Sequence, residues 1–397
     1  MPEVSGFVAD GFEPVRAAFE ANFRDHGDLG AGVCVYRGGA PVVDLVGGVT
    51  AHGSDDLYRA DHLQMVFSTT KGAAAICAHL LAERGQLDLD APVASYWPEF
   101  AANGKADIPV SWLLCHKSGL VDVDRPLTLD DALDWDRVTA ALAAAPPIWE
   151  PGTQHGYHAV TYGWLVGEIV RRVSGRTLGR FFADEIAGPL GLEFWIGLPD
   201  EQIPRVVDLV PPGPPPGVHF GSPDDPQPGM IEMLQLLMGP DSLIARALTA
   251  PGGAFASETV WNEPAVWQAE IPAANGITNA GSLARMYAAT VGEVDGVRLL
   301  SPATVARAIE PQTEGADAVL IFEIPFGLGF MRDAVRQVRQ PDRLWSLRRG
   351  RLGRLRRSRG GDRVRLRDEQ DGPRHRGRPA NVGPDRRALR VPVSRHE

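Results

Sequence analysis

The chain has 397 residues, 44% of them hydrophobic, enough for one large domain or two ordinary domains with a buried core. No apolar run reaches the length of about 18 residues that a membrane-spanning helix needs, so no membrane partner is predicted. The first six residues do not lead from a basic stretch into an apolar one, and the 3 cysteines are widely spaced, which predicts a cytoplasmic protein without a signal peptide, disulfide framework or zinc site.

The net charge of −10 is unevenly distributed along the chain. Residues 331–397 contain 21 arginines, no lysine and 8 acidic residues, a balance of +13, which leaves −23 for residues 1–330. A composition that changes so abruptly indicates that the last part of the chain has a separate cause or role.

Apolar residues at helical spacing predict a first helix over residues 11–25. Two β-rich runs follow, at 32–36 and 41–46, and the glycine-containing segment 37–40 between them predicts a hairpin turn. An antiparallel strand pair preceded by a helix therefore leads to the segment around Ser68.

Ser68 and Lys71 stand three residues apart at the start of an alanine-rich run, and they form the only Ser-x-x-Lys in the chain. If Ser68 opens a helix, Lys71 lies one turn further on the same face. A serine hydroxyl is a weak nucleophile, but an amine within hydrogen-bond reach, with a pKa lowered by a dry site, can remove its proton. The same pattern also fits a helix-capping serine beside a solvated lysine, so other motifs must decide between the two.

The helix that starts at Ser68 is predicted to end at Arg84-Gly85. Residues 211–229 hold eight prolines and four glycines, which predicts an irregular loop. No internal repeat is present. Further helices are predicted at 112–120, closed by Gly119, and at 130–145, 161–173, 231–248, 280–291 and 302–309.

The sequence motifs of three other kinds of site are absent: the nucleophile elbow of α/β-hydrolases, a phosphate-binding loop and a metal site. No Gly-x-Ser-x-Gly and no glycine-rich phosphate loop after a strand occur in the chain. His155 and His158 have no acidic or cysteine partners nearby in the sequence, which favours turn and core histidines over metal ligands. The sequence therefore predicts no cofactor and no metal.

Four further segments follow Ser68 along the chain. They are Leu113–Leu120, Trp149–Thr153 ahead of Tyr157, Tyr162–Glu168 and Gly188–Leu192. Together with Ser68 and Lys71 they resemble the β-lactamase-related serine esterases. These are the family VIII carboxylesterases, relatives of class C β-lactamases and D-Ala-D-Ala peptidases. The resemblance covers roughly residues 10–330.

The resemblance implies an α/β fold of the α+β type, with an antiparallel sheet flanked by helices and a mostly helical lobe at about 85–290. It implies that Ser68 is the acylated nucleophile, Lys71 its proton partner and Tyr157 the tyrosine that shares the role of base. A phenol near a lysine ammonium ionises more easily, and a phenolate can relay a proton to a leaving alkoxide. Tyr157 also fits an ordinary half-buried tyrosine.

The predicted substrates are small carboxylic esters. Class C β-lactamases have Tyr-x-Asn where this chain has Tyr157-His158-Ala159, so the amide that binds a β-lactam side chain is absent. A β-lactamase or D-Ala-D-Ala peptidase-like hydrolase and a catalytically impaired relic are the alternatives. We expect no nucleic-acid partner, and the sequence leaves the oligomeric state open.

The resemblance also implies a C-terminal strand with His/Trp/Lys-x-Gly beside the serine, which supplies a backbone N–H to the oxyanion hole. No such strand is recognisable after Met331; the segment 348–357 is arginine-rich, without strand or helix periodicity. We therefore divide the chain into a hydrolase domain, 1–331, and an anomalous tail, 332–397.

We hypothesise that the tail is translated from the correct DNA in a shifted frame. Codons exist for residues 363–373 that, read one base on, encode Val-Phe-Gly-Tyr-Val-Met-Asn-Lys-Met-Gly-Pro. Those for residues 344–349 can likewise encode Phe-Gly-His-Ser-Gly-Ala, which contains the missing His-x-Gly. The alternative is a basic arm that binds nucleic acid or acidic partners, which arginine without lysine or interleaved aromatic residues disfavours.

Overall fold

The computed structural model describes residues 3–210, 230–332, 345–346 and 353–354, all within the first of the two units of the chain, Met1–Arg357. It confirms the predicted α+β class, with small antiparallel sheets and many helices. The strands are β1 (Val4–Val8), β2 (Gly30–Arg37), β3 (Ala40–Gly48), β4 (Gln64–Met65), β5 (Phe194–Trp195), β6 (Ile277–Thr278), β7 (Trp345–Ser346) and β8 (Gly353–Arg354). The α-helices are α1 (Glu13–His26), α2 (Thr70–Glu83), α3 (Val110–Leu114), α4 (Leu129–Leu133), α5 (Trp135–Ala144), α6 (Tyr162–Ser174), α7 (Leu178–Phe182), α8 (Gly188–Leu190), α9 (Met230–Met238), α10 (Leu243–Thr249), α11 (Pro264–Gln268), α12 (Ala280–Val291) and α13 (Pro302–Ala308).

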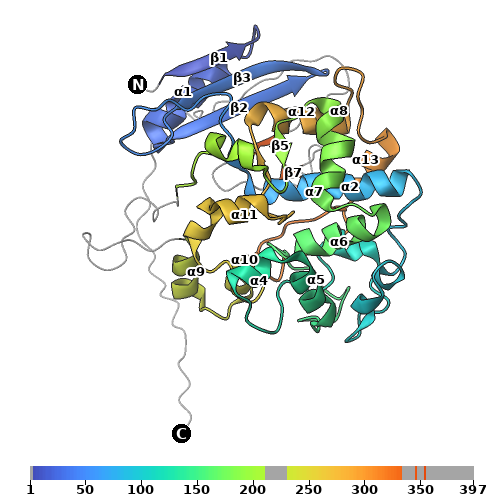
Figure 1. The fold of residues 1–397 in the computed structure, drawn as a ribbon. Coiled ribbons are helices and arrows are strands. Elements are labelled where there is room, and N and C mark those ends of the chain that lie inside the picture. Colours follow the sequence, from blue (N-terminus) through green and yellow to red (C-terminus); the bar gives the residue numbers. More distant parts are fainter. Residues whose placement is uncertain (1–2, 211–229, 333–344, 347–352, 355–397) are drawn as a thin grey trace, which may run out of the picture. The chain divides into compact units, whose positions relative to one another are not determined.

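The larger sheet has the order β1-β3-β2 and is antiparallel throughout; Figure 1 shows it in blue beside the helices. Side chains along a strand point alternately to the two faces of a sheet. Val43 and Leu45 of β3 pack on one face with Phe19 and Phe23 of α1. α12 approaches β2 at Gly32, where an added Cβ would lie 3.2 Å from a side chain of that helix. The predicted hairpin of 32–36 and 41–46 is thus β2 and β3, and the sequence missed β1.

Helix α2 is the central element of the helical part. Every residue from Thr70 to Leu81 is buried, because the small alanine side chains let other helices pack closely around it. Gly72 shows how close this packing is: an added Cβ would lie 2.0 Å from the hydroxyl oxygen of Tyr287 on α12. α2 is therefore held rigidly at the residues that follow Ser68.

Three predicted helices are shorter or divided. The helix predicted at 112–120 is wrong beyond Leu114: α3 ends there, and His116 and Gly119 take left-handed backbone conformations with φ of +64° and +77°. The helix predicted at 130–145 is two helices, because Asp134 has an extended ψ of 109° and its side chain caps α5 at the backbone N–H of Arg137.

The helix predicted at 231–248 is also two, α9 and α10. Gly239 has a φ of +88°, which ends the first helix, and the Ser242 hydroxyl caps the second. The helices predicted at 280–291 and 302–309 agree with α12 and α13.

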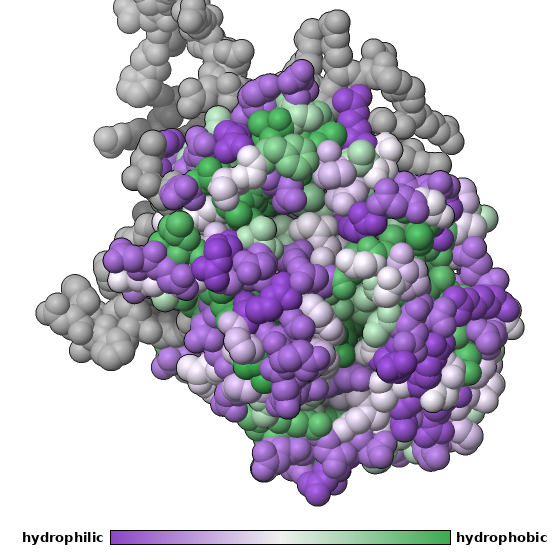
Figure 2. All heavy atoms as spheres, turned by 45° about the horizontal axis from the view of Figure 1, so that its top comes forward, coloured by the Kyte–Doolittle hydropathy of each residue, from purple (hydrophilic) through white to green (hydrophobic). Residues whose placement is uncertain are grey.

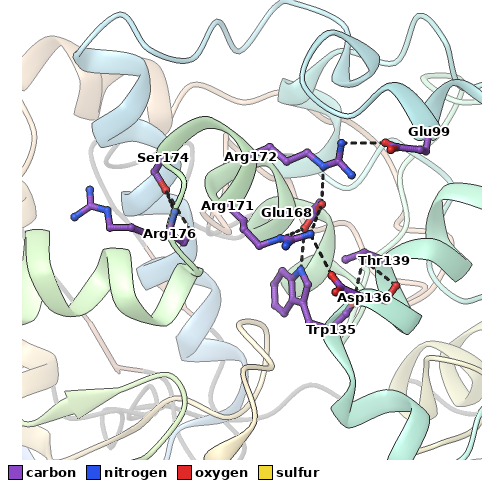
Figure 3. A network of polar contacts seen from close by, with 9 residues as sticks. All are labelled: Glu99, Trp135, Asp136, Thr139, Glu168, Arg171, Arg172, Ser174 and Arg176. Carbon is purple, nitrogen blue, oxygen red and sulfur yellow. Dashed lines mark hydrogen bonds and ion pairs between the residues drawn. The ribbon is translucent and has the colours of Figure 1, made fainter.

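A buried carboxylate joins α5 and α6. Glu168 of α6 accepts hydrogen bonds from Trp135 of α5 at 2.8 Å, from Arg171 at 2.7 Å and from Arg172 at 2.6 Å (Figure 3). Burial alone raises the pKa of Glu168, but the bonds from these three donors outweigh it and hold the pKa below its usual value. The network fixes two helices of the helical part against each other.

No helix among the described residues has the length and apolar character needed to pass through a bilayer. The face in Figure 2 is mostly hydrophilic, with apolar residues in small separate areas. The sequence analysis predicted no strand after Met331. The structure has two there, β7 and β8, which are two residues long each and pair antiparallel. The loop predicted at 211–229 and most of the tail, including the proposed frameshift, lie outside the described residues.

Candidate active site

Ser68 lies in a 3-10 turn, Phe67–Thr69, between β4 and α2. Phe67 has a φ of +41°, which non-glycine residues rarely adopt, and its ring packs edge-on against Trp261 with centroids 5.5 Å apart. The backbone N–H of Val66 donates to Gly276 at 2.8 Å, which ties this segment to the residues before β6. These contacts present the Ser68 side chain at the N-terminal end of α2, as predicted.

Lys71 lies in the first turn of α2 and is only 5% exposed. Its Nζ is 3.2 Å from Ser68 Oγ, 2.6 Å from the Ala159 carbonyl oxygen and 3.0 Å from the Ala273 carbonyl oxygen. Burial lowers the pKa of Lys71 well below its ordinary value of 10.5. A neutral amine has two hydrogens and one lone pair, and two carbonyls can only accept. The charged amine donates its third hydrogen to Ser68 Oγ, whereas the neutral amine, with its two hydrogens on Ala159 and Ala273, turns its lone pair toward the Ser68 hydroxyl.

Tyr157 reaches the same serine from the loop before α6. Its hydroxyl donates to Ser68 Oγ at 2.7 Å, and its ring lies 4.8 Å from Lys71 Nζ. Burial raises the pKa of Tyr157; the hydrogen bond to Ser68 lowers it in part, and the charge of Asp317 raises it further. We expected a nearby ammonium to lower the pKa of Tyr157. The pKa is raised instead, because burial disfavours both the ammonium and the phenolate.

The backbone at Tyr157 is held by a buried carboxylate that sequence analysis did not single out. Asp317 Oδ1 accepts hydrogen bonds from the N–H groups of Tyr157 at 3.1 Å, Val319 at 2.8 Å and Leu320 at 2.7 Å. Asp317 lies 160 residues from Tyr157, so no local pattern reveals the contact.

The two histidines near Tyr157 are both buried. His158 donates from Nδ1 to the Gly156 carbonyl at 2.6 Å, while its Nε2 accepts from Ser118 Oγ at 2.8 Å and from Leu120 N–H at 3.1 Å. Burial lowers the pKa of His158 to about 4. His155 Nε2 lies 3.9 Å from Asp317 Oδ2. Within the described part of the chain, no group of three or more side chains has the arrangement of a metal site.

A small cavity of about 20 Å³ adjoins Ser68. Its walls come from α2, from the loops after α3 and before α6, from α12 and from the last described residues before the tail. They are Ser68, Lys71, Gly72, His116, Tyr157, Tyr287, Phe326, Gly329, Phe330 and Met331. The structure thus brings together all three predicted site residues and adds His116, to which the sequence analysis gave no role.

The sequence matches the family described as Beta-lactamase over residues 15–349. It is 34% identical over 345 residues to the Mycobacterium tuberculosis protein named Esterase/beta-lactamase LipL, covering 82% of this chain and 74% of the relative. A penicillin-binding protein homologue from Caulobacter crescentus is 36% identical with a TM-score of 0.73, and a family VIII carboxylesterase is 34% identical with a TM-score of 0.73; each comparison covers 86% of this chain and 87% of the other. The chain belongs to the beta-lactamase family of serine hydrolases.

Proposed function

We propose that the chain is a serine carboxylesterase in which Ser68 is the nucleophile, Lys71 the general base and Tyr157 the general acid. The observation that carries the proposal is that one hydroxyl oxygen, Ser68 Oγ, lies within hydrogen-bond distance of both a buried amine and a buried phenol. Burial lowers the pKa of the amine, which favours its proton-accepting form, and raises the pKa of the phenol, which favours its proton-donating form.

In the acylation step, the Ser68 proton passes to Lys71 while Oγ attacks the ester carbonyl carbon. The tetrahedral intermediate collapses as Tyr157 gives its proton to the leaving alkoxide, and the Lys71 ammonium returns a proton to the phenolate. In deacylation, a water molecule gives a proton to the same pair and attacks the acyl carbon, and Ser68 Oγ leaves and recovers its proton. Both steps need only these three side chains for proton transfer.

Two observations favour carboxylic esters as substrates. The side chain at Ala159 is a methyl group, which offers no amide to a β-lactam, while its carbonyl is used to bind Lys71. The similar structure named a family VIII carboxylesterase supports the same choice, while the relative named Esterase/beta-lactamase LipL is consistent with either substrate class. The similar penicillin-binding protein homologue keeps β-lactams and D-Ala-D-Ala peptides as the alternative.

The test compares p-nitrophenyl acetate and butyrate with nitrocefin as substrates of the purified chain. We expect ester hydrolysis that Ser68→Ala abolishes. Retention of that activity in Ser68→Ala would refute the assignment, and nitrocefin turnover above ester turnover would favour the lactamase alternative.

A second experiment separates an enzyme from a relic. The strand that the family resemblance implies for completing the oxyanion hole is not recognisable in the sequence after Met331. A fluorophosphonate probe reports a reactive serine without needing turnover, so labelling at Ser68 in this polypeptide supports an active site, and the absence of labelling supports the relic.

A further inference from the structure

His116 occupies a strained and buried position in the loop after α3. Its backbone φ of +64° lies in the left-handed region, and the residue is only 3% exposed. Non-glycine residues keep such a conformation where surrounding contacts impose it, and they occur preferentially at functional sites. The position of the ring is therefore determined by its neighbours.

Those neighbours fix the tautomer of the imidazole. His116 Nδ1 accepts a hydrogen bond from the backbone N–H of His158 at 3.1 Å, so the hydrogen of the neutral ring is on Nε2. The ring packs against Tyr157 and Tyr162, each with centroids 5.1 Å away, and against Phe326 at 4.6 Å. Burial, together with the nearby His158, Lys71 and His155, lowers the pKa of His116 well below its usual value, which keeps it neutral.

The Nε2–H group is the remaining polar group of this ring. No residue in the described ranges accepts a hydrogen bond from it, and His116 lines the cavity that it shares with Ser68 and Lys71. A volume of about 20 Å³ admits a group the size of one water molecule. His116 Nε2 is not among the fully enclosed polar atoms without a partner, so its N–H has access to the cavity, where an acceptor can complete its hydrogen bonding.

The other three polar side chains that line the cavity with Ser68, those of Lys71, Tyr157 and Tyr287, already use their hydrogens in other bonds. The hydrogens of Lys71 bind the carbonyls of Ala159 and Ala273 and, in the charged form, Ser68 Oγ. The hydroxyl hydrogen of Tyr157 binds Ser68, and that of Tyr287 binds the Thr69 carbonyl. His116 thus supplies a donor that none of the three provides.

We propose that His116 donates its Nε2–H to an oxygen atom held beside Ser68. In the free protein this oxygen belongs to a water molecule, and after Ser68 has reacted it belongs to the group attached to Oγ. Only the second state rests on the proposed function.

The first test is nuclear magnetic resonance of the full chain with ¹⁵N-labelled histidine. We expect His116 to be the neutral Nε2–H tautomer at neutral pH, with a cross peak between Nε2–H and bound water. A fluorophosphonate then attaches phosphorus to Ser68 Oγ, fluoride leaves, and the serine proton passes to Lys71. The His116 Nε2–H resonance should shift on this modification.

His62 is the matched control for this experiment. It is also buried, and its Nδ1 also accepts a backbone N–H bond, from Arg59 at 3.1 Å, but it lies outside the cavity at Ser68. Its resonances should stay unchanged. A charged or Nδ1–H form of His116, or an unmoved His116 resonance after Ser68 is modified, overturns the proposal. If Ser68 is not modified at all, the proposed function fails, and the water cross peak of the free protein alone decides this proposal.

The second test measures the rate of fluorophosphonate labelling in variants. His116→Phe keeps a planar ring without a donor and should label about tenfold more slowly or worse, as expected for one lost hydrogen bond. His116→Gln places an N–H at a similar reach and should recover most of the rate, whereas His62→Gln should label at the wild-type rate. Labelling of His116→Phe at the wild-type rate contradicts the proposal.

Discussion

The charge states of Lys71 and Tyr157 determine which of them can act as base. Both groups are buried, and burial shifts the pKa of each toward its neutral form, an amine with a lone pair and a phenol with its proton. The two carbonyls that bind Lys71 come from Ala159 and Ala273, which hold the amine in one orientation toward Ser68. The proposed division into base and acid follows from this arrangement.

Ester turnover should therefore depend on pH through Lys71. The deprotonated amine is the active form, so kcat/KM should rise with pH and level off at a pH well below the ordinary lysine pKa of 10.5. Lys71→Arg keeps a permanent charge and should reduce kcat/KM by roughly 100-fold or more at every pH. An unchanged pH profile in Lys71→Arg would exclude Lys71 as the base.

Removing the phenol hydroxyl should affect poor leaving groups most. Tyr157→Phe removes the proton donor for the leaving alkoxide, and an alkyl alkoxide needs that proton more than p-nitrophenolate does. We expect kcat/KM to fall by about 100-fold for ethyl butyrate and by about tenfold or less for p-nitrophenyl butyrate. Equal losses for both esters would indicate that Tyr157 only positions Ser68.

Much of the candidate site could be predicted from the sequence, because Ser68 in the 3-10 turn and Lys71 in the first turn of α2 are three residues apart and this spacing fixes their proximity. The partners that set their protonation could not. Ala273 lies 202 residues from Lys71, and Asp317 lies 160 residues from Tyr157. The direction of the Tyr157 pKa shift depends on burial, which only the packed structure determines.

At the scale of elements, the approach of α12 to α2 depends on Gly72. Gly72→Ala places a Cβ 2.0 Å from the Tyr287 hydroxyl oxygen, so Tyr287 or α12 must move. We expect a loss of about 1–3 kcal/mol in the free energy of unfolding, measured by urea denaturation.

Gly281→Ala provides the control for that substitution. Gly281 lies in α12, and an added Cβ meets its nearest atom at 3.6 Å, an ordinary contact. This variant should be unchanged or more stable, by up to about 1 kcal/mol, because alanine favours helix. Equal stability of the two variants would show that the contact at Gly72 is relieved without cost.

The carboxylate network in Figure 3 gives a pH-dependent contribution to stability. The folded pKa of Glu168 is lowered, so its contribution is present above the unfolded pKa of 4.5 and is lost as the pH falls below it. Glu168→Gln should lower the free energy of unfolding by about 2–4 kcal/mol at pH 7, and by less at pH 4. Asp136→Asn is the control: the Asp136 side chain is 80% exposed, so its ion pair with Arg171 should contribute at most about 0.5 kcal/mol.

Sequence patterns predicted the long helices better than their boundaries. α12 has a clear start, because Asn279 caps it at the N–H of Ser282, and its range was predicted correctly. The break at Asp134 was missed because apolar residues, Leu133 and Trp135, stand on both sides of it and no glycine or proline marks it. β1 was missed because its sequence, Val-Ser-Gly-Phe-Val, is short and does not alternate strictly between apolar and polar residues.

For the whole molecule, the main prediction concerns the tail. If the frameshift hypothesis is correct, resequencing the gene will find a broken frame in the 330–339 region. A frame-restored protein should then hydrolyse p-nitrophenyl butyrate faster than the present chain, by on the order of 100-fold if one oxyanion donor is recovered. An unbroken frame would refute the hypothesis.

The burial of Lys71 has a practical consequence, because the chain has only three lysines. Lys105 is also fully enclosed, with its ammonium bound to the carbonyls of Ala102 and Ala145, and only Lys117 is partly accessible. Amine-selective dyes or resins applied to the native protein should therefore attach at Lys117 in preference to the other two. Since Lys117 directly follows His116, a fluorophore there would give an optical signal from the immediate vicinity of the cavity.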